Sequence, residues 1–177
     1  MNRAGGKLMS RGRFAEALSC FYKALDFYGK CGQDNKQSLA ALSNNIGHAY
    51  VSLQKPEKAL LFFSRAAELR EALGDTEGLA WQHANVGSAL RDLGDFREAA
   101  RHYLEALMLF ESAGASAPAC DQHANLGYAL AMLGDTVRAI GHYEAAVSGY
   151  SASDDRDRAE ACKRNIAALR GAGQEKD

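Results

Sequence analysis

A repeat of 40 residues constrains the fold of this chain more than any other feature of its sequence. An asparagine followed two residues later by glycine recurs at this period, and the last copy has alanine in place of glycine. A small residue followed four residues later by an aromatic recurs alongside it. Such duplication predicts a stack of similar structural units. The repeated strings are Asn45-Ile46-Gly47, Asn85-Val86-Gly87, Asn125-Leu126-Gly127 and Asn165-Ile166-Ala167, and the small-aromatic pairs are Ala17 with Phe21, Ala59 with Phe63, Ala99 with Tyr103 and Ala139 with Tyr143.

Each unit is predicted to be a pair of α-helices. Apolar residues recur at spacings of three and four on both sides of turns such as Leu93-Gly94-Asp95-Phe96, where glycine ends one helix and Asp caps the next. The chain has 17 glycines and only 2 prolines, which fits chain breaks made at helix ends. We therefore expect an all-α chain with first helices of the pairs at about 36–53, 76–93 and 117–133, second helices at about 14–29, 56–73, 96–113 and 136–150, and a final helix at about 155–170.

The recurring small residues are expected where the two helices of a pair touch. Gly87 and Ala99 would permit a close approach of the two backbones, and Tyr103 would fill the space beside them. A larger residue at Gly87 is expected to overpack this crossing.

These strings resemble the tetratricopeptide repeat, which carries a glycine with leucine or tyrosine three residues later, a Gly-Asp-aromatic turn and Ala-x-x-x-aromatic-x-x-Ala. The usual unit of that family has 34 residues, so these 40-residue units are similar to the longer ones of the Pins-type spindle-orientation adaptors and, more loosely, of kinesin light chains. The resemblance implies a right-handed α-solenoid whose inner groove holds a peptide. We expect a single domain over residues 1–170, made of repeats at about 1–34, 35–74, 75–114 and 115–153 and a capping helix at 154–170, with a loose tail at 171–177.

The sequence carries none of the motifs that mark a catalytic or cofactor site. It has no phosphate-binding glycine-rich loop, no Gly-x-Ser-x-Gly elbow, no His-Glu-x-x-His and no closely spaced cysteine pair. We therefore predict neither an enzyme nor a cofactor. Histidines that recur at the period, His83 with His123 and His102 with His142, should stand about 8–10 Å apart in neighbouring units, which is too far for them to share a metal ion. No metal site is predicted.

Charge and hydropathy argue against two classes of partner. The formal net charge is -1, so the chain lacks the basic field that is typical of nucleic-acid binders. The longest purely apolar run, residues 128–133, is far shorter than the roughly 18 residues that span a bilayer, so no membrane partner is predicted. The four cysteines include no close pair, which is typical of reduced thiols and favours a cytoplasmic location.

The asparagines of the repeated string are the main candidates for binding, because asparagine has a poor propensity for the middle of a helix. In one interpretation their amides line the groove and hydrogen-bond the backbone of an extended peptide. In the other, each amide bonds the adjoining helix and fixes the stacking of repeats. Their position beside the buried stripe favours the groove interpretation. The candidate groove residues are Asn44, Asn45, His48, Trp81, Asn85, Ser88, Arg91, Asn125, Tyr128 and Arg164.

Trp81 has two interpretations, an anchor that covers an apolar group of the peptide or a structural residue at the start of its helix. Tetratricopeptide domains that clamp chaperone C-termini use Lys and Asn in this groove. Such a clamp is largely absent here, because the matching places are occupied by Asn2, Gly6, Asn44, His48, Ala84 and Ser88.

The pattern as a whole predicts a non-enzymatic adaptor that binds an extended peptide segment of a partner protein. The alternative is a structural module that assembles with itself through an exposed repeat edge or the convex face of the second helices. Only four residues precede Gly5, so two turns of the first helix are missing relative to the later units. Either the chain was cut from a longer array, which we favour, or it begins with a frayed half-unit. In both cases the face with Phe14, Phe21 and Phe27 is expected to be uncovered and to permit a weak homodimer.

Overall fold

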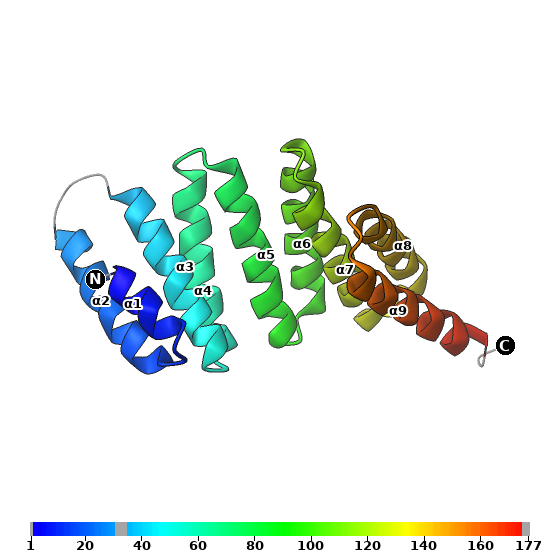
Figure 1. Ribbon diagram of the computed structural model, residues 1–177, viewed down its shortest axis with the longest axis horizontal. Helices are drawn as coiled ribbons and strands as arrows, with labels where there is room; N and C mark the ends of the chain where they lie inside the picture. Colours follow the sequence, from blue (N-terminus) through cyan, green and yellow to red (C-terminus); the bar gives the residue numbers. More distant parts are fainter. Residues whose placement is uncertain (1, 31–34, 175–177) are drawn as a thin grey trace. The chain divides into compact units, whose positions relative to one another are not determined.

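The computed structural model describes residues 2–30 and 35–174, with side chains described as far as Gly171, and every regular element within these ranges is an α-helix (Figure 1). The predicted helices are found with ends within three residues of the expected positions, except that the last helix continues past 170 through residues expected to form a loose tail. Residues 175–177 lie outside the described part of the chain. The helices are α1 (Asn2–Met9), α2 (Phe14–Lys30), α3 (Lys36–Ser52), α4 (Pro56–Glu71), α5 (Thr76–Asp92), α6 (Phe96–Ser112), α7 (Ser116–Met132), α8 (Thr136–Ala152) and α9 (Arg156–Gln174).

The turns inside the helix pairs have the structure that their sequences predict. Gly134 adopts a left-handed conformation with φ of 80°, which ends α7 without the steric cost that a side chain would add. The carboxylate of Asp135 then accepts a hydrogen bond from the backbone N–H of Arg138 at 3.1 Å and caps α8. At this turn glycine and aspartate thus set where one helix stops and the next begins.

Two turns between successive helices use a residue other than glycine at the left-handed position. Gln54, between α3 and α4, has φ of 55°, and Asp154, between α8 and α9, has φ of 57°. Both residues carry a Cβ in a conformation that costs an L-amino acid about 1–2 kcal/mol. These two turns are therefore strained relative to the glycine turns.

Helix pairs are held together by a glycine on the first helix that faces an aromatic ring on the second. A Cβ added to Gly47 would lie 2.5 Å from an atom of the Phe63 ring, and one added to Gly127 would lie 2.9 Å from the Tyr143 ring. Only glycine permits this approach, because ordinary carbon contacts are about 3.5–4.0 Å. The close approach expected for Gly87 is thus observed at the corresponding glycines one period before and after it.

The short first helix covers more of α2 than the sequence suggested. Gly5 of α1 packs against the ring of Phe21, which is fully buried, so the expectation of an uncovered face is wrong for this residue. Phe14 is partly buried, and only Phe27 keeps a large exposed fraction, 53%. Eight residues of helix are enough to cover Phe21 because the glycine lets the two backbones approach.

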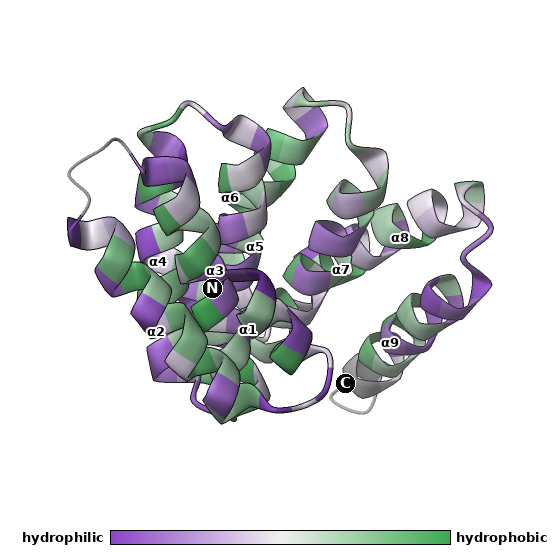
Figure 2. Ribbon diagram, turned by 60° about the vertical axis from the view of Figure 1, so that its left-hand side comes forward, coloured by the Kyte–Doolittle hydropathy of each residue, from purple (hydrophilic) through white to green (hydrophobic). Residues whose placement is uncertain are grey.

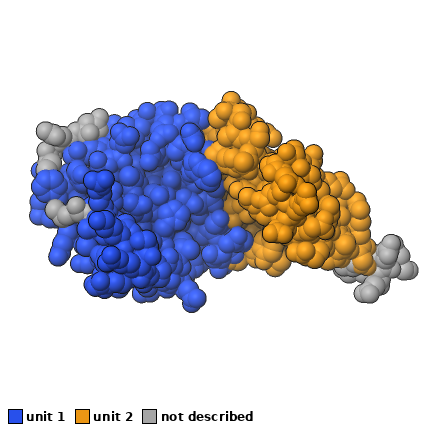
Figure 3. Space-filling model, viewed as in Figure 1, with its two compact units in different colours: residues 1–93 blue, residues 94–177 orange. Residues whose placement is uncertain are grey.

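The chain divides into two compact units, residues 1–93 and 94–177 (Figure 3). In the first unit, aromatic and aliphatic side chains of α2 to α5 form one core around Phe21, Phe63 and Ile46. In the second, α8 and α9 enclose a cluster that includes Tyr143, Tyr150 and Ile166. Each unit therefore buries apolar surface of its own.

Figure 2 shows hydrophilic and hydrophobic residues mixed within helices such as α1, α2 and α9. This is the pattern of helices that are buried on one side only. Among the described residues, no helix has a stretch that is both long and apolar enough to cross a membrane.

Candidate functional site

A cavity of about 430 Å³ lies on the face of the first unit that α3 and α5 share, and we refer to it as the α3–α5 cavity. Two successive first helices supply most of its lining because their equivalent faces come from the same position in the repeat. The end of α4 closes it. The lining residues are Asn44 and His48 of α3, Arg70 of α4, and Gly78, Trp81, Gln82 and Asn85 of α5.

The amides of this cavity are linked across the two helices. Asn85 donates from Nδ2 to Oδ1 of Asn44 at 3.2 Å. In the same way Asn45 donates from Nδ2 to Oδ1 of Asn2, on α1, at 3.0 Å. These are contacts that the stacking interpretation of the asparagines expects. An amide has two N–H groups and a carbonyl oxygen, so each still has capacity for a ligand.

One residue that lines the cavity, Arg70, belongs to an ion pair. Arg70 bonds the carboxylate of Asp75, and Asp75 also caps α5 by accepting from the backbone N–H of Gly78 at 2.8 Å. These hydrogen bonds, chiefly that from Gly78, lower the pKa of Asp75. A Cβ at Gly78 would lie 2.5 Å from Oδ2 of Asp75, so a larger residue here would displace this carboxylate. The charge of Arg70 is thus neutralised within the site.

Two buried polar atoms near the cavity have no hydrogen-bond partner among the described residues: Nε of Arg70 and Oε1 of Gln82. Desolvation lowers the pKa of His48, whose ring meets that of Phe63 edge to face at 5.1 Å, so this imidazole is neutral at pH 7. Trp81 stands beside these groups with 42% of its surface exposed. The cavity therefore offers neutral hydrogen-bonding groups next to an exposed indole.

The structure brings together four of the predicted groove residues, Asn44, His48, Trp81 and Asn85, around this cavity. Three other cavity residues were not predicted: Arg70, Gly78 and Gln82. Gln82 had a signal in the sequence, because the string Gln-His-Ala-Asn occurs at residues 82–85 and again at 122–125. Both glutamines are buried, with 4% and 2% of their surface exposed.

The remaining predicted groove residues of the first unit, Asn45, Ser88 and Arg91, are not part of the cavity lining. Arg91 pairs with the neighbouring Asp92 at 2.8 Å. Three predicted residues belong to the second unit. Asn125 donates to Oε1 of Gln122 on its own helix at 3.3 Å. The ring of Tyr128 meets that of Phe96 edge to face with 6.1 Å between the ring centroids, and Tyr128 is 42% exposed. Arg164 is exposed on α9.

At the position one period after Trp81, Asp121 joins three helices of the second unit. Its Oδ1 accepts from the Tyr150 hydroxyl at 2.7 Å and from Nη1 of Arg158 at 2.5 Å. The Arg158 guanidinium also lies over the Tyr150 ring, 4.9 Å from its centroid. Burial and the bond to Asp121 raise the pKa of Tyr150, which stays protonated. This network attaches α9 to α7 and α8.

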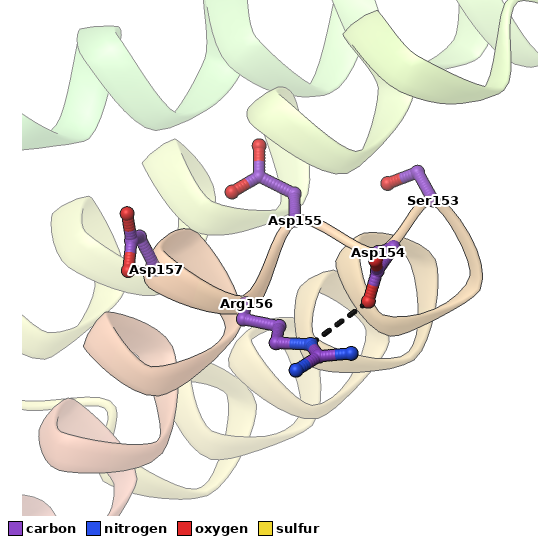
Figure 4. A pocket seen from close by; sticks show the side chains of 5 residues that line it. All are labelled: Ser153, Asp154, Asp155, Arg156 and Asp157. Carbon is purple, nitrogen blue, oxygen red and sulfur yellow. Dashed lines mark hydrogen bonds and ion pairs between the residues drawn. The ribbon is translucent and has the colours of Figure 1, made fainter.

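A second polar cavity, about 630 Å³, lies at the turn between α8 and α9 (Figure 4). It is lined by Ser153, Asp154, Asp155, Arg156 and Asp157. Asp154 accepts from Nε of Arg156 at 2.9 Å, and Asp155 caps α9 through the N–H of Arg158 at 3.2 Å. Asp154 and Asp155 thus have local structural partners, and we assign the cavity no function.

One histidine contact was not predicted from the sequence. His123 of α7 and His142 of α8 face each other inside one helix pair, and their Nδ1 atoms are 3.0 Å apart. The sequence held a signal for this pair, because the two histidines lie at similar sequence separations on either side of the Gly134 turn, which joins their helices.

Comparisons with known proteins agree with this architecture. No curated protein sequence matches the chain. The solved structure of BtubC from P. vanneervenii is 22% identical and superimposes with a TM-score of 0.73, covering 96% of this chain and 78% of that one. A putative kinesin light chain from Podosopora anserina with nearly identical TPR-like repeats is 14% identical, with a TM-score of 0.73 and coverage of 98% of this chain and 94% of that one. The Rap conjugation gene regulator of plasmid pLS20, in complex with the Phr* peptide, is 20% identical, with a TM-score of 0.67 and coverage of 82% of this chain and 40% of that one. At these identities the likeness shows the fold, and it confirms the predicted all-α repeat solenoid.

The tetratricopeptide repeat model matches residues 1–72 and again residues 38–112. These overlapping matches span α1 to α6 and contain the glycine-aromatic contacts and capped turns of the first unit. The chain therefore belongs to the tetratricopeptide repeat family.

Proposed function

We propose that the chain is a non-enzymatic adaptor that binds an extended peptide segment of a partner protein in the α3–α5 cavity. The observation that carries this proposal is the cavity itself, in which the Asn44 and Asn85 amides stand beside the exposed indole of Trp81. The free cysteines among the described residues, Cys20, Cys120 and Cys162, support a cytoplasmic location for it.

The chemistry of the cavity suits the backbone of a peptide better than a charged group. Its only full charges, on Arg70 and Asp75, neutralise each other, and His48 is neutral at pH 7. The amides can each donate to a peptide carbonyl and accept from a peptide N–H. The indole offers a flat apolar surface against which one aliphatic or aromatic side chain of the peptide can pack.

A peptide as the class of partner also has support from a structural relative, because the Rap regulator of pLS20 was solved with the Phr* peptide. For the other predicted groove residues, Asn45, Ser88, Arg91, Asn125, Tyr128 and Arg164, a contact with the peptide stays a prediction.

The test uses Trp81 as its own reporter, because it is the only tryptophan of the chain. Peptides selected from a random display library on the purified protein are titrated while the emission of Trp81 is followed. We expect binding to shift the emission, and Asn85→Ala to weaken it about 2- to 12-fold, since one neutral hydrogen bond is worth about 0.5–1.5 kcal/mol.

The matched control is Asn165→Ala, which removes the periodic equivalent of Asn85 from α9, in the second unit. It should leave the affinity unchanged. Peptides that bind with no change in Trp81 emission, and equally well to Asn85→Ala, would place the binding surface elsewhere and refute the proposal.

The alternative function, self-assembly, is favoured by one observation: large apolar residues stand exposed on second helices. Leu61 of α4 is 65% exposed and Val137 of α8 is 83% exposed. Sedimentation velocity over a range of concentrations tests it. A concentration-dependent dimer that Leu61→Lys or Val137→Lys abolishes would support assembly through the exposed residues of the second helices. A dimer that only Phe27→Lys abolishes would support assembly through the first-repeat edge.

A further inference from the structure

Gln82, which lines the α3–α5 cavity, is a buried amide with an unused acceptor. Only 4% of its surface is exposed, and its Oε1 accepts no hydrogen bond from any described residue. Gln122, at the same position one period later, is 2% exposed, but its Oε1 accepts from Nδ2 of Asn125 at 3.3 Å. Both glutamines stand three residues before an asparagine in the string Gln-His-Ala-Asn. Because residues three apart are neighbours on a helix, the same bond is open to Asn85 and Gln82.

Asn85 instead bonds the preceding first helix. Its Nδ2 donates to Oδ1 of Asn44 on α3 at 3.2 Å, and both asparagines line the cavity. Asn85 is thus the one asparagine of the repeated string with an amide at both acceptor positions, that of Asn44 on the preceding first helix and that of Gln82 on its own. The other asparagines have an amide at one of these positions or at neither: Asn45 has Asn2 and Leu42, Asn125 has Ala84 and Gln122, and Asn165 has Ala124 and Cys162.

We propose that Gln82 is a positioning residue for Asn85, which changes its acceptor when a peptide binds. In the free protein Asn85 bonds Asn44. In the complex a backbone N–H of the peptide donates to Oδ1 of Asn44, and Nδ2 of Asn85 donates to Oε1 of Gln82. This inference rests on the proposed function, because it concerns a peptide bound in the α3–α5 cavity.

The change of acceptor satisfies a buried polar atom that the free protein leaves without a partner. An unpaired buried acceptor is unfavourable, because it has lost its hydrogen bonds to water. Gln82 is too buried to meet the peptide itself, whereas Asn44 and Asn85 are only partly buried. The peptide can therefore reach Oδ1 of Asn44, and Asn85 passes the gain on to Gln82.

This arrangement selects the kind of group that the peptide presents. A ligand with an N–H at Asn44 replaces the bond that Asn85 gives up, so every acceptor of the three amides that was paired stays paired. A ligand that offers only acceptors leaves Asn85 on Asn44 and Oε1 of Gln82 unpaired. We therefore expect the residue of the peptide that lies at Asn44 to have a free backbone N–H, which excludes proline there.

The first test needs no ligand and compares the two glutamines in the free protein. Methionine has nearly the size of glutamine and no amide. Gln82→Met should melt at or above the temperature of the wild type, because it removes an unpaired acceptor. Gln122→Met should melt about 2–6 °C lower, because it removes the bonds to Asn125 and to the carbonyl oxygen of Pro118.

The second test is a double-mutant cycle on binding, with a fluorescein-labelled peptide from the display selection as the probe and fluorescence anisotropy as the measurement. Gln82→Met should weaken binding about 2- to 12-fold, the effect of one neutral hydrogen bond. In the Asn85→Ala background it should cause no further loss, because Gln82 acts through Asn85. A glutamine with a purely structural role would not show this coupling.

The third test changes the peptide and leaves the protein intact. Replacing each backbone amide of the peptide in turn by an ester removes one N–H at a time. One of these esters should weaken binding to the wild type about 2- to 12-fold and should not weaken binding to Asn44→Ala. A crystal structure of the complex should show Asn85 bonded to Gln82.

Failure of this inference can be told apart from failure of the proposed function. Peptides that bind without changing the emission of Trp81 contradict the proposed function. Peptides that change it contradict only this inference if they bind Gln82→Met as tightly as the wild type, if the losses from Gln82→Met and Asn85→Ala add, or if no ester depends on Asn44. The inference is also overturned if Gln82→Met melts as far below the wild type as Gln122→Met, or if Asn85 still bonds Asn44 in the complex.

Discussion

Replacing Gly127 with alanine tests whether glycine is required where the two helices of a pair touch. The added Cβ would lie 2.9 Å from Cγ and Cδ1 of Tyr143 and 3.0 Å from Cε1. Tyr143 is only 3% exposed, so its ring has little space into which it can move. Either the ring or the helix must shift.

The net effect is the difference between two opposing terms. Overpacking a core costs about 1–3 kcal/mol, while alanine is better than glycine inside a helix by about 1 kcal/mol. We therefore expect Gly127→Ala to lower the stability by about 1 kcal/mol. Gly141→Ala is the matched control, because no atom lies within 4 Å of a Cβ added at that position of α8, and it should raise the stability by about 1 kcal/mol.

Thermal denaturation followed by circular dichroism at 222 nm measures both variants. At about 2–4 °C per kcal/mol for a chain of this size, their melting temperatures should differ by about 4–8 °C and lie on opposite sides of the wild type. Midpoints are compared because repeat arrays can unfold unit by unit. If Gly127→Ala melts at or above the temperature of Gly141→Ala, the close approach is not what requires glycine.

Three other predictions follow from the turns, the cap and the amides. Gln54→Gly should raise the melting temperature, because it relieves a left-handed conformation that costs about 1–2 kcal/mol; an unchanged value would show that the turn is not strained. The pKa of Asp75 is lowered in the folded state, so its contribution to stability is fully present above its unfolded pKa of about 3.9 and is lost as the pH falls through the lower folded value. Between pH 5 and pH 2 the melting temperature of Asp75→Asn should therefore fall less than that of the wild type. An equal fall in both proteins would contradict this assignment. The Asn85→Ala, Asn125→Ala double variant should lose about 5- to 150-fold in affinity for a selected peptide if both amides bind it, whereas unchanged affinity with a lower melting temperature would assign them to stacking.

The sequence predicted the helices well because their limits are set locally. Glycine and aspartate occur together at the turns at 74–75, 94–95 and 134–135, and the 40-residue period shows which turns are equivalent. Where one of these residues is replaced, as at Gln54, the neighbouring helices still end at the expected place. The tetratricopeptide repeat family followed from the same strings.

The candidate site was predicted only in part, because contacts between helices depend on their packing and not on the period alone. The four predicted residues of the α3–α5 cavity belong to first helices, whose equivalent faces the period identifies. Arg70 comes from the end of α4, and its place in the cavity depends on its bond to Asp75 across a turn. The His123–His142 contact likewise depends on how α7 and α8 face each other.

The glycine-aromatic contact has a consequence for how the length of such a chain can change. Both members of each contact belong to the same helix pair, as in Gly5 with Phe21, Gly47 with Phe63 and Gly127 with Tyr143. A gene duplication or deletion of 40 codons in register therefore carries both members of the contact together, and no compensating substitution is needed in the neighbouring units. A substitution of one member alone leaves a clash or a void. Related arrays are thus expected to differ by whole units, while the glycine and its aromatic partner change together.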